Sequence, residues 1–178
     1  FTFRHSWAWT DPHGWFGDGR DKWPWLDHYP QKPGWHEAPD KPEQITLEFL
    51  KGVPVGMNGE AMSGRDLITK LNIVAGSHGI GRSNLIEDRI LGLKARENYE
   101  HPAATVILTA HADLEQLTLT RQELAFKRMV DDKWSELAYM GLVHEPLFQD
   151  LNAFINESQQ KVNGKVDLQL YKGCCHVM

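Results

Sequence analysis

The spacing of apolar residues changes twice along this 178-residue chain, and the changes restrict the folds open to it. In residues 45–49 apolar and polar side chains alternate, as in a strand with one buried face, and residues 166–170 repeat the alternation. Between these segments, apolar residues recur every three or four positions, which is typical of amphipathic helices. Strands, then helices, then strands predict an α+β fold with a largely antiparallel sheet packed with several helices.

Local signals place the ends of the expected elements. Ser63 and Thr120 each precede an acidic residue by three positions, as in a capping box, and Pro102 and Pro146 suit a first helical turn. We therefore expect helices over residues 63–76, 102–117, 120–138 and 146–158. Turns are expected at residues 51–52, joining two strands of a hairpin, and at residues 163–164, before the last strand.

The first 37 residues differ from the rest of the chain. They hold six of the seven tryptophans and follow neither a helical nor a strand period. We expect an irregular aromatic-rich arm over residues 1–37, followed by a domain over residues 38–178. The tryptophans either anchor the arm on its own domain or stack on a sugar or a partner surface; packing on the domain is the expected case.

Charge and composition exclude several classes of protein. Nineteen basic against twenty-four acidic residues give a net charge of −5, which argues against a nucleic-acid-binding domain. No apolar run has the length of a membrane span, so we expect a soluble, cytoplasmic protein without nucleic-acid or membrane partners.

Cys174 and Cys175 are adjacent, unlike zinc ligands, and are expected to be free thiols. The chain shows no signal peptide and begins without Met, so we expect a piece of a longer polypeptide.

A glycine string follows the first expected helix. Gly76, Gly79 and Gly81 do not follow a strand, and no Lys-Ser or Lys-Thr pair comes after them, so a phosphate-binding loop is disfavoured. The glycines instead predict a tight turn at which the backbone closely approaches another group.

The segment after the glycines carries the candidate site. "LIEDRILGL", residues 85–93, favours an extended strand, in which Glu87 and Arg89 would share a face. A half-buried Glu87 needs a partner, and two remain open. It forms an ion pair with Arg82 or Arg89, or it accepts from a ligand ammonium while Tyr99 hydrogen-bonds the same small ligand.

His111 and Glu115 lie four positions apart on an expected helix. Two such side chains can contribute to a metal site, but an ordinary pair on one helix face is the expected arrangement. We predict no metal site in this chain.

Five segments of this chain, in the same order, resemble the C-terminal half of argininosuccinate synthase: "APDKPEQITLEFLKGVPVGMNG", "LITKLNIVAGSHGIGR", "IEDRILGLKARENYEHP", "TAHADLEQLTL" and "VNGKVDLQLYKG". The resemblance covers residues 38–173. It implies an ATP-dependent ligase, with Mg²⁺, in arginine biosynthesis. In that family the ureido oxygen of citrulline is adenylated with loss of pyrophosphate, and the amine of aspartate then displaces AMP. It also implies a homo-oligomer, a tetramer in the full enzyme.

The resemblance further implies that Glu87, in "IEDR", and Tyr99, in "YEHP", bind citrulline; the family's separation of twelve residues is kept. The family's nucleotide-binding half and its aspartate-binding segment have no counterpart here, so the isolated chain is expected to lack an ATP site and to be inactive. The alternative is a catalytically inactive binding or assembly module on the same scaffold. The chain departs from the family's pattern at Asn84, Asp88, Ala95 and His101.

Overall fold

The computed structural model describes residues 4–7 and 38–178. Its strands are β1 (Arg4–Trp7), β2 (Glu43–Leu50), β3 (Val53–Met57), β4 (Glu60–Ala61), β5 (Arg82–Asp88), β6 (Lys94–Glu100), β7 (Gly164–Tyr171) and β8 (Cys174–Val177). Its helices are α1 (Gly64–Ser77), α2 (Pro102–Thr118), α3 (Arg121–Tyr139) and α4 (Pro146–Gln159). All strand pairs are antiparallel, in one sheet ordered β4-β3-β2-β7-β8 and a second ordered β1-β6-β5. The predicted α+β fold is confirmed.

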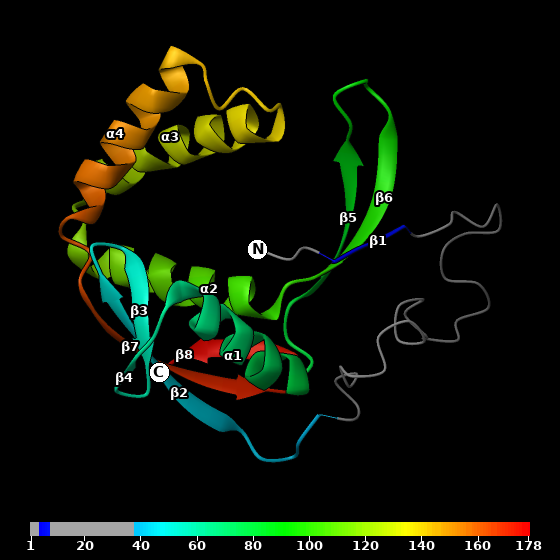
Figure 1. Cartoon of the computed structure of the whole chain (residues 1–178), viewed down its shortest axis with the longest axis vertical. Helices are drawn as coiled ribbons and strands as arrows, with labels where there is room; N and C mark the ends of the chain where they lie inside the picture. Colours follow the sequence, from blue (N-terminus) through cyan, green and yellow to red (C-terminus); the bar gives the residue numbers. More distant parts are fainter. Residues whose placement is uncertain (1–3, 8–37) are drawn as a thin grey trace.

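The five-stranded sheet and two helices enclose the hydrophobic core (Figure 1). β2 pairs with β7 from Glu43 to Phe49, and Leu47 and Leu168, on their inner faces, are fully buried. Leu71 of α1 and Val106 of α2 are equally inaccessible to solvent and pack in the same core. Each such side chain contributes about 1.5–3 kcal/mol by leaving water, so the alternation read in the sequence is also the main source of stability.

The predicted helix boundaries are confirmed to within one or two residues. Ser63 caps α1 by accepting from the backbone N–H of Asp66. Thr120 begins α3 with a complete capping box, in which its hydroxyl accepts from the N–H of Glu123 and the Glu123 carboxylate accepts from the N–H of Thr120. These bonds satisfy donors that have no partner inside the helix.

Two arms extend from this core (Figure 1). α2 runs across the sheet and connects the β5–β6 hairpin, at its N-terminal end, with the antiparallel pair α3 and α4, beyond its C-terminal end. Residues 4–7 form β1, which pairs with β6; the rest of the predicted arm, residues 1–3 and 8–37, lies outside the described residues. No helix of the described part is long and apolar enough to cross a membrane.

The expected strand over residues 85–93 is wrong at its end. β5 stops at Asp88, and the chain reverses through a turn in which the N–H of Arg89 donates to the carbonyl of Leu93. Gly92, with φ of 76°, makes the turn possible because few other residues adopt a positive φ. Arg89 therefore lies in a turn and does not continue the strand face of Glu87.

Candidate functional site

The base of the β5–β6 hairpin is fixed against the start of α2. The N–H of His101 donates to the carbonyl of Gly81 at 2.8 Å. A Cβ on Gly81 would lie 2.5 Å from the Cα of Pro102, and its φ is 90°. The close approach predicted from the glycine string is thus confirmed here, and the group approached is the protein's own backbone.

The two predicted site residues occupy related positions in the hairpin. Tyr99 pairs with Ser83 across the ladder, and Glu87 pairs with Ala95. Alternate residues of a strand lie on one face, so the positions of Ser83, Glu87 and Tyr99 share a face of the hairpin. Four residues along β5 correspond to about 13 Å between the positions of Ser83 and Glu87. Tyr99 is half-buried.

Arg82, one of the two ion-pair partners considered for Glu87, is engaged on the opposite face. Its Nε donates to Oε1 of Glu100 at 2.9 Å, and both side chains are nearly buried, 11% and 5% exposed. Arg82 and Glu87 are five positions apart in one strand, so they lie on opposite faces. The register thus places the positions of Arg82 and Glu87 on opposite faces of β5, while the pair of Glu87 with Arg89 stays an alternative to ligand binding.

A hydrogen-bonded chain next to Tyr99 was not predicted from the sequence. Nε2 of His101 lies 3.2 Å from Oγ of Ser83, and Nδ1 of His101 lies 2.9 Å from Oγ1 of Thr105. All three residues are half-buried. Ser83 and His101 are eighteen positions apart, so only the hairpin register brings them together; the departure from the family at His101 was the available signal.

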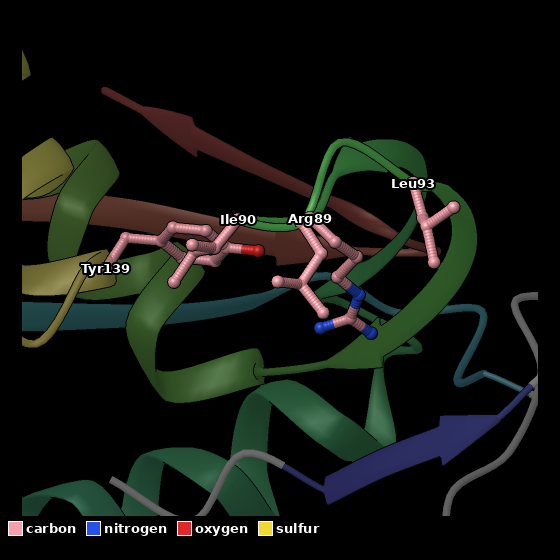
Figure 2. A pocket seen from close by; sticks show the side chains of 5 residues that line it. Arg89, Ile90, Leu93 and Tyr139 are labelled. Atoms are coloured by element: carbon pink, nitrogen blue, oxygen red, sulfur yellow. The ribbon is translucent and has the colours of Figure 1, made fainter.

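An open cavity of about 420 Å³ lies between the tip of the hairpin and the end of α3 (Figure 2). Arg89, Ile90, Leu91 and Leu93 line it from the turn, and Tyr139 lines it from α3. In Figure 2 Tyr139 and Leu93 lie toward opposite ends of the view, with Arg89 between them. Leu91 is 86% exposed, so this apolar turn suits contact with another surface better than chemistry on a small polar ligand.

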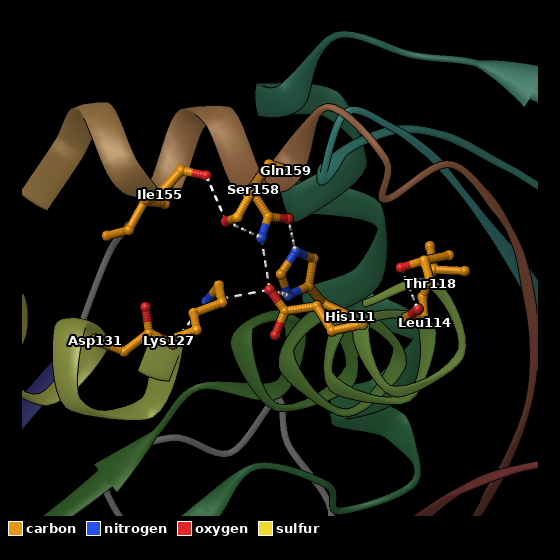
Figure 3. A network of polar contacts seen from close by, with 9 residues as sticks. His111, Leu114, Thr118, Lys127, Asp131, Ile155, Ser158 and Gln159 are labelled. Atoms are coloured by element: carbon orange, nitrogen blue, oxygen red, sulfur yellow. Dashed lines mark hydrogen bonds and ion pairs between the residues drawn. The ribbon is translucent and has the colours of Figure 1, made fainter. Parts of the chain in front are cut away.

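His111 and Glu115 belong to a polar network that joins α2, α3 and α4 (Figure 3). Oε1 of Glu115 accepts from Nε2 of Gln159 at 2.6 Å and lies 3.1 Å from Nζ of Lys127, which also donates to Asp131 at 2.6 Å. Burial alone would lower the pKa of Lys127, but the hydrogen bonds to the two carboxylates outweigh it, so the pKa is raised.

This network is structural. His111 bonds Gln159 at 2.9 Å and lies 3.9 Å from Glu115, the helix-face pair that was expected. Among the described residues, no group of three or more His, Cys, Asp or Glu side chains is arranged to hold a metal ion.

Comparisons with known proteins agree with the resemblance. The family model for the arginosuccinate synthase C-terminal domain matches residues 18–178. Argininosuccinate synthase of Methanosarcina barkeri is 60% identical over 142 residues, which are 80% of this chain and 36% of the relative. The Archaeoglobus fulgidus enzyme is 58% identical over 142 residues, with the same coverage, and the Pyrococcus furiosus enzyme is 54% identical over 137, which are 77% of this chain and 33% of the relative.

The chain thus spans about a third of the length of these relatives. The match begins at residue 18, inside the segment predicted to be an arm. With a family model covering most of the chain and relatives above half identity, the chain belongs to the argininosuccinate synthase family and corresponds to its C-terminal domain.

Proposed function

We propose that this chain supplies the citrulline-binding side of an argininosuccinate synthase, the ligase that joins citrulline to aspartate with release of AMP and pyrophosphate. The register of the β5–β6 hairpin supports the proposal. It places the positions of Glu87 and Tyr99 on one face of the hairpin, and these positions match the family's citrulline-binding residues. Two free thiols, Cys174 and Cys175, agree with a reducing cytoplasm.

The chemistry of the two side chains suits a zwitterion. The carboxylate of Glu87 would accept from the α-ammonium, a charge-assisted bond, and the hydroxyl of Tyr99 would bond a polar group farther along the substrate. Tyr99 lies across the ladder from Ser83, whose position is about 13 Å along β5 from that of Glu87, and the two long side chains shorten this separation, so an extended amino acid can bridge Glu87 and Tyr99. Glu87 and Tyr99 would thus hold citrulline by both ends.

The reaction needs groups beyond these. ATP with Mg²⁺ supplies the adenylyl group that is transferred to the ureido oxygen, with pyrophosphate as the leaving group, and this transfer requires backbone donors and a metal site that position the phosphates. We propose that the nucleotide-binding and aspartate-binding parts come from the remaining two thirds of the family protein, on the same or a second polypeptide. The 178 residues alone would then release no pyrophosphate.

A chimera tests the proposal. The part of the Methanosarcina barkeri enzyme that matches this chain is replaced by the corresponding residues of this chain, and citrulline-dependent pyrophosphate release is measured. The chimera should be active and the isolated chain inactive. Turnover by the isolated chain would show a nucleotide site that the proposal does not contain.

The role of Glu87 is tested in the same chimera. Glu87→Gln removes the charge but keeps the shape, and loss of a charged hydrogen bond of about 1.5–3 kcal/mol weakens citrulline binding about 10- to 150-fold. Glu157→Gln, the same change at an exposed position on α4, is the matched control and should leave binding unaltered. Unchanged affinity in Glu87→Gln would refute the assignment, and a collapse of the melting temperature together with binding would support the ion pair instead.

We also propose that the protein assembles with copies of itself, as a tetramer in the complete enzyme. Exposed apolar side chains on the hairpin tip and on α3 support this: Ile90, Leu91, Leu93, Phe126 and Met129. Light scattering should show an oligomer, and Leu91→Asp should weaken it. An oligomeric but inactive chimera would favour the alternative function, an assembly module without catalysis.

A further inference from the structure

The hydrogen-bond pattern of α2 indicates which nitrogen of His101 carries the proton. Oγ1 of Thr105 donates to the carbonyl of His101 at 3.1 Å, the same bond to the residue four positions earlier that Thr109 and Thr118 make in this helix. A hydroxyl has one proton to donate. Toward Nδ1 of His101, at 2.9 Å, Thr105 is therefore the acceptor, and Nδ1 carries the hydrogen in the neutral ring.

The state of Ser83 follows from this tautomer. With Nδ1 protonated, Nε2 of neutral His101 is an acceptor, so the hydroxyl of Ser83 donates its proton to Nε2 across 3.2 Å. The lone pairs of the Ser83 oxygen remain available. Toward any third group, Ser83 is an acceptor and not a donor.

Ser83 lies beside the proposed substrate site. It is the ladder partner of Tyr99, and directly opposite residues have Cβ atoms about 4.5–5.5 Å apart on one face. The position of Glu87 is on the same face, about 13 Å away. The packing of Gly81 against Pro102 holds Ser83 and His101 in place from both sides of the hairpin base.

We propose that Ser83 is a further substrate-binding residue, an acceptor for the ureido N–H groups of citrulline. His101 is a positioning residue, because its Nε2 takes the proton of the Ser83 hydroxyl and thereby keeps the Ser83 oxygen an acceptor. The inference rests on the proposed function. With the ammonium at Glu87, the ureido end lies toward Tyr99 and Ser83. An acceptor there holds the ureido group by its nitrogens and leaves its oxygen, the nucleophile, uncovered; a donor would compete for that oxygen.

The tautomer is tested on the 178-residue chain without substrate. Long-range ¹H–¹⁵N correlation spectra of histidine, recorded at alkaline pH where the imidazole is neutral, should show the Nδ1–H form for His101. Ser83→Ala should shift the Nε2 resonance of His101. An Nε2–H tautomer would overturn the inference, because Ser83 would then be free to donate.

The binding role is tested by kinetics in the chimera described above. Ser83→Ala should raise KM for citrulline about tenfold and leave KM for ATP and aspartate unchanged. His101→Leu should have the same effect, and the double variant should be no worse, because both act through one hydroxyl. His101→Gln, whose amide oxygen accepts from Ser83, should recover most of the loss. A purely structural role would instead lower the melting temperature and change all three KM values together.

The outcomes separate this inference from the proposed function. If Glu87→Gln and Tyr99→Phe raise KM for citrulline but Ser83→Ala does not, the inference fails and the proposed function stands. If none of the three changes KM for citrulline, the proposed function fails and the inference fails with it.

Discussion

Replacing Gly81 by alanine tests whether the hairpin is rigidly held at its base. The added Cβ would lie 2.5 Å from both the Cα and N of Pro102 and 2.7 Å from the carbonyl carbon of His101. These are backbone atoms, which cannot rotate away as the end of a side chain can. The φ of 90° at Gly81 adds a second, separate cost, because alanine rarely adopts a positive φ.

The two costs can be estimated separately. A non-glycine residue in a positive-φ conformation costs about 1–2 kcal/mol. Forcing an extra carbon into closely packed surroundings costs about 1–3 kcal/mol. We therefore expect Gly81→Ala to lower the free energy of unfolding by about 2–5 kcal/mol. Because a domain is stable by only about 5–15 kcal/mol, this is a large fraction of the total.

Two other glycines serve as matched controls. Gly141 has a φ of 74° and no atom within 4 Å of an added Cβ, so Gly141→Ala should show the conformational cost alone, about 1–2 kcal/mol. Gly64, in the first turn of α1, has neither a positive φ nor a neighbour, so Gly64→Ala should be neutral or slightly stabilising.

Urea unfolding of the three variants, followed by circular dichroism, measures the differences. The expected order of destabilisation is Gly81→Ala, then Gly141→Ala, then Gly64→Ala. Equal losses for Gly81→Ala and Gly141→Ala would refute the reasoning, since the hairpin would then move aside freely. In that event His101 and Ser83 would not be held in a fixed geometry either.

Three further predictions concern the rest of the fold. Lys127→Met should cost about 3–5 kcal/mol in urea unfolding, because it leaves the carboxylate of Glu115, which is only 12% exposed, without its cation; an effect below about 1 kcal/mol would contradict the network. A hydrogen bond from Lys161, then bonds from Thr120, lower the pKa of Glu123 to about 2 from 4.5. Its stabilisation is present above pH 4.5 and lost as pH falls through 2, so wild type and Glu123→Gln should converge in stability toward pH 2 and differ at pH 6. Burial, then the neighbouring Cys174, raise the pKa of Cys175 to about 11, so iodoacetamide at pH 8 should label exposed Cys174 and spare Cys175 in peptide mass spectra; equal labelling would contradict this.

Local signals made the elements predictable from the sequence. The capping box at Thr120 and the prolines at the starts of α2 and α4 act within one helical turn, so the sequence contains the whole interaction. The end of β5 was missed because the apolar residues of "RILGL" favour a strand, whereas the backbone bond between Arg89 and Leu93 closes a turn. At residues 89–93 the closure of the β5–β6 hairpin therefore outweighs the strand preference of the apolar residues.

The candidate site was predictable only in part. Glu87 and Tyr99 could be named because their types and spacing match a family motif, which is a property of the sequence. That they share a face of one hairpin depends on the pairing of Ser83 with Tyr99, which the residues alone do not specify. A register shift of one residue would place them on opposite faces.

The sequence by itself determined the strands and helices of this protein, because apolar period, caps and turn residues act over a few positions. Only the tertiary structure decided which distant polar groups meet. The hydroxyl of Ser83 reaches His101 through a hairpin register, and Lys127 of α3 reaches Glu115 of α2 through the way the two helices are placed relative to one another. Such bonds form over about 3 Å and in restricted directions, so they depend on how whole elements dock, which no short stretch of residues encodes.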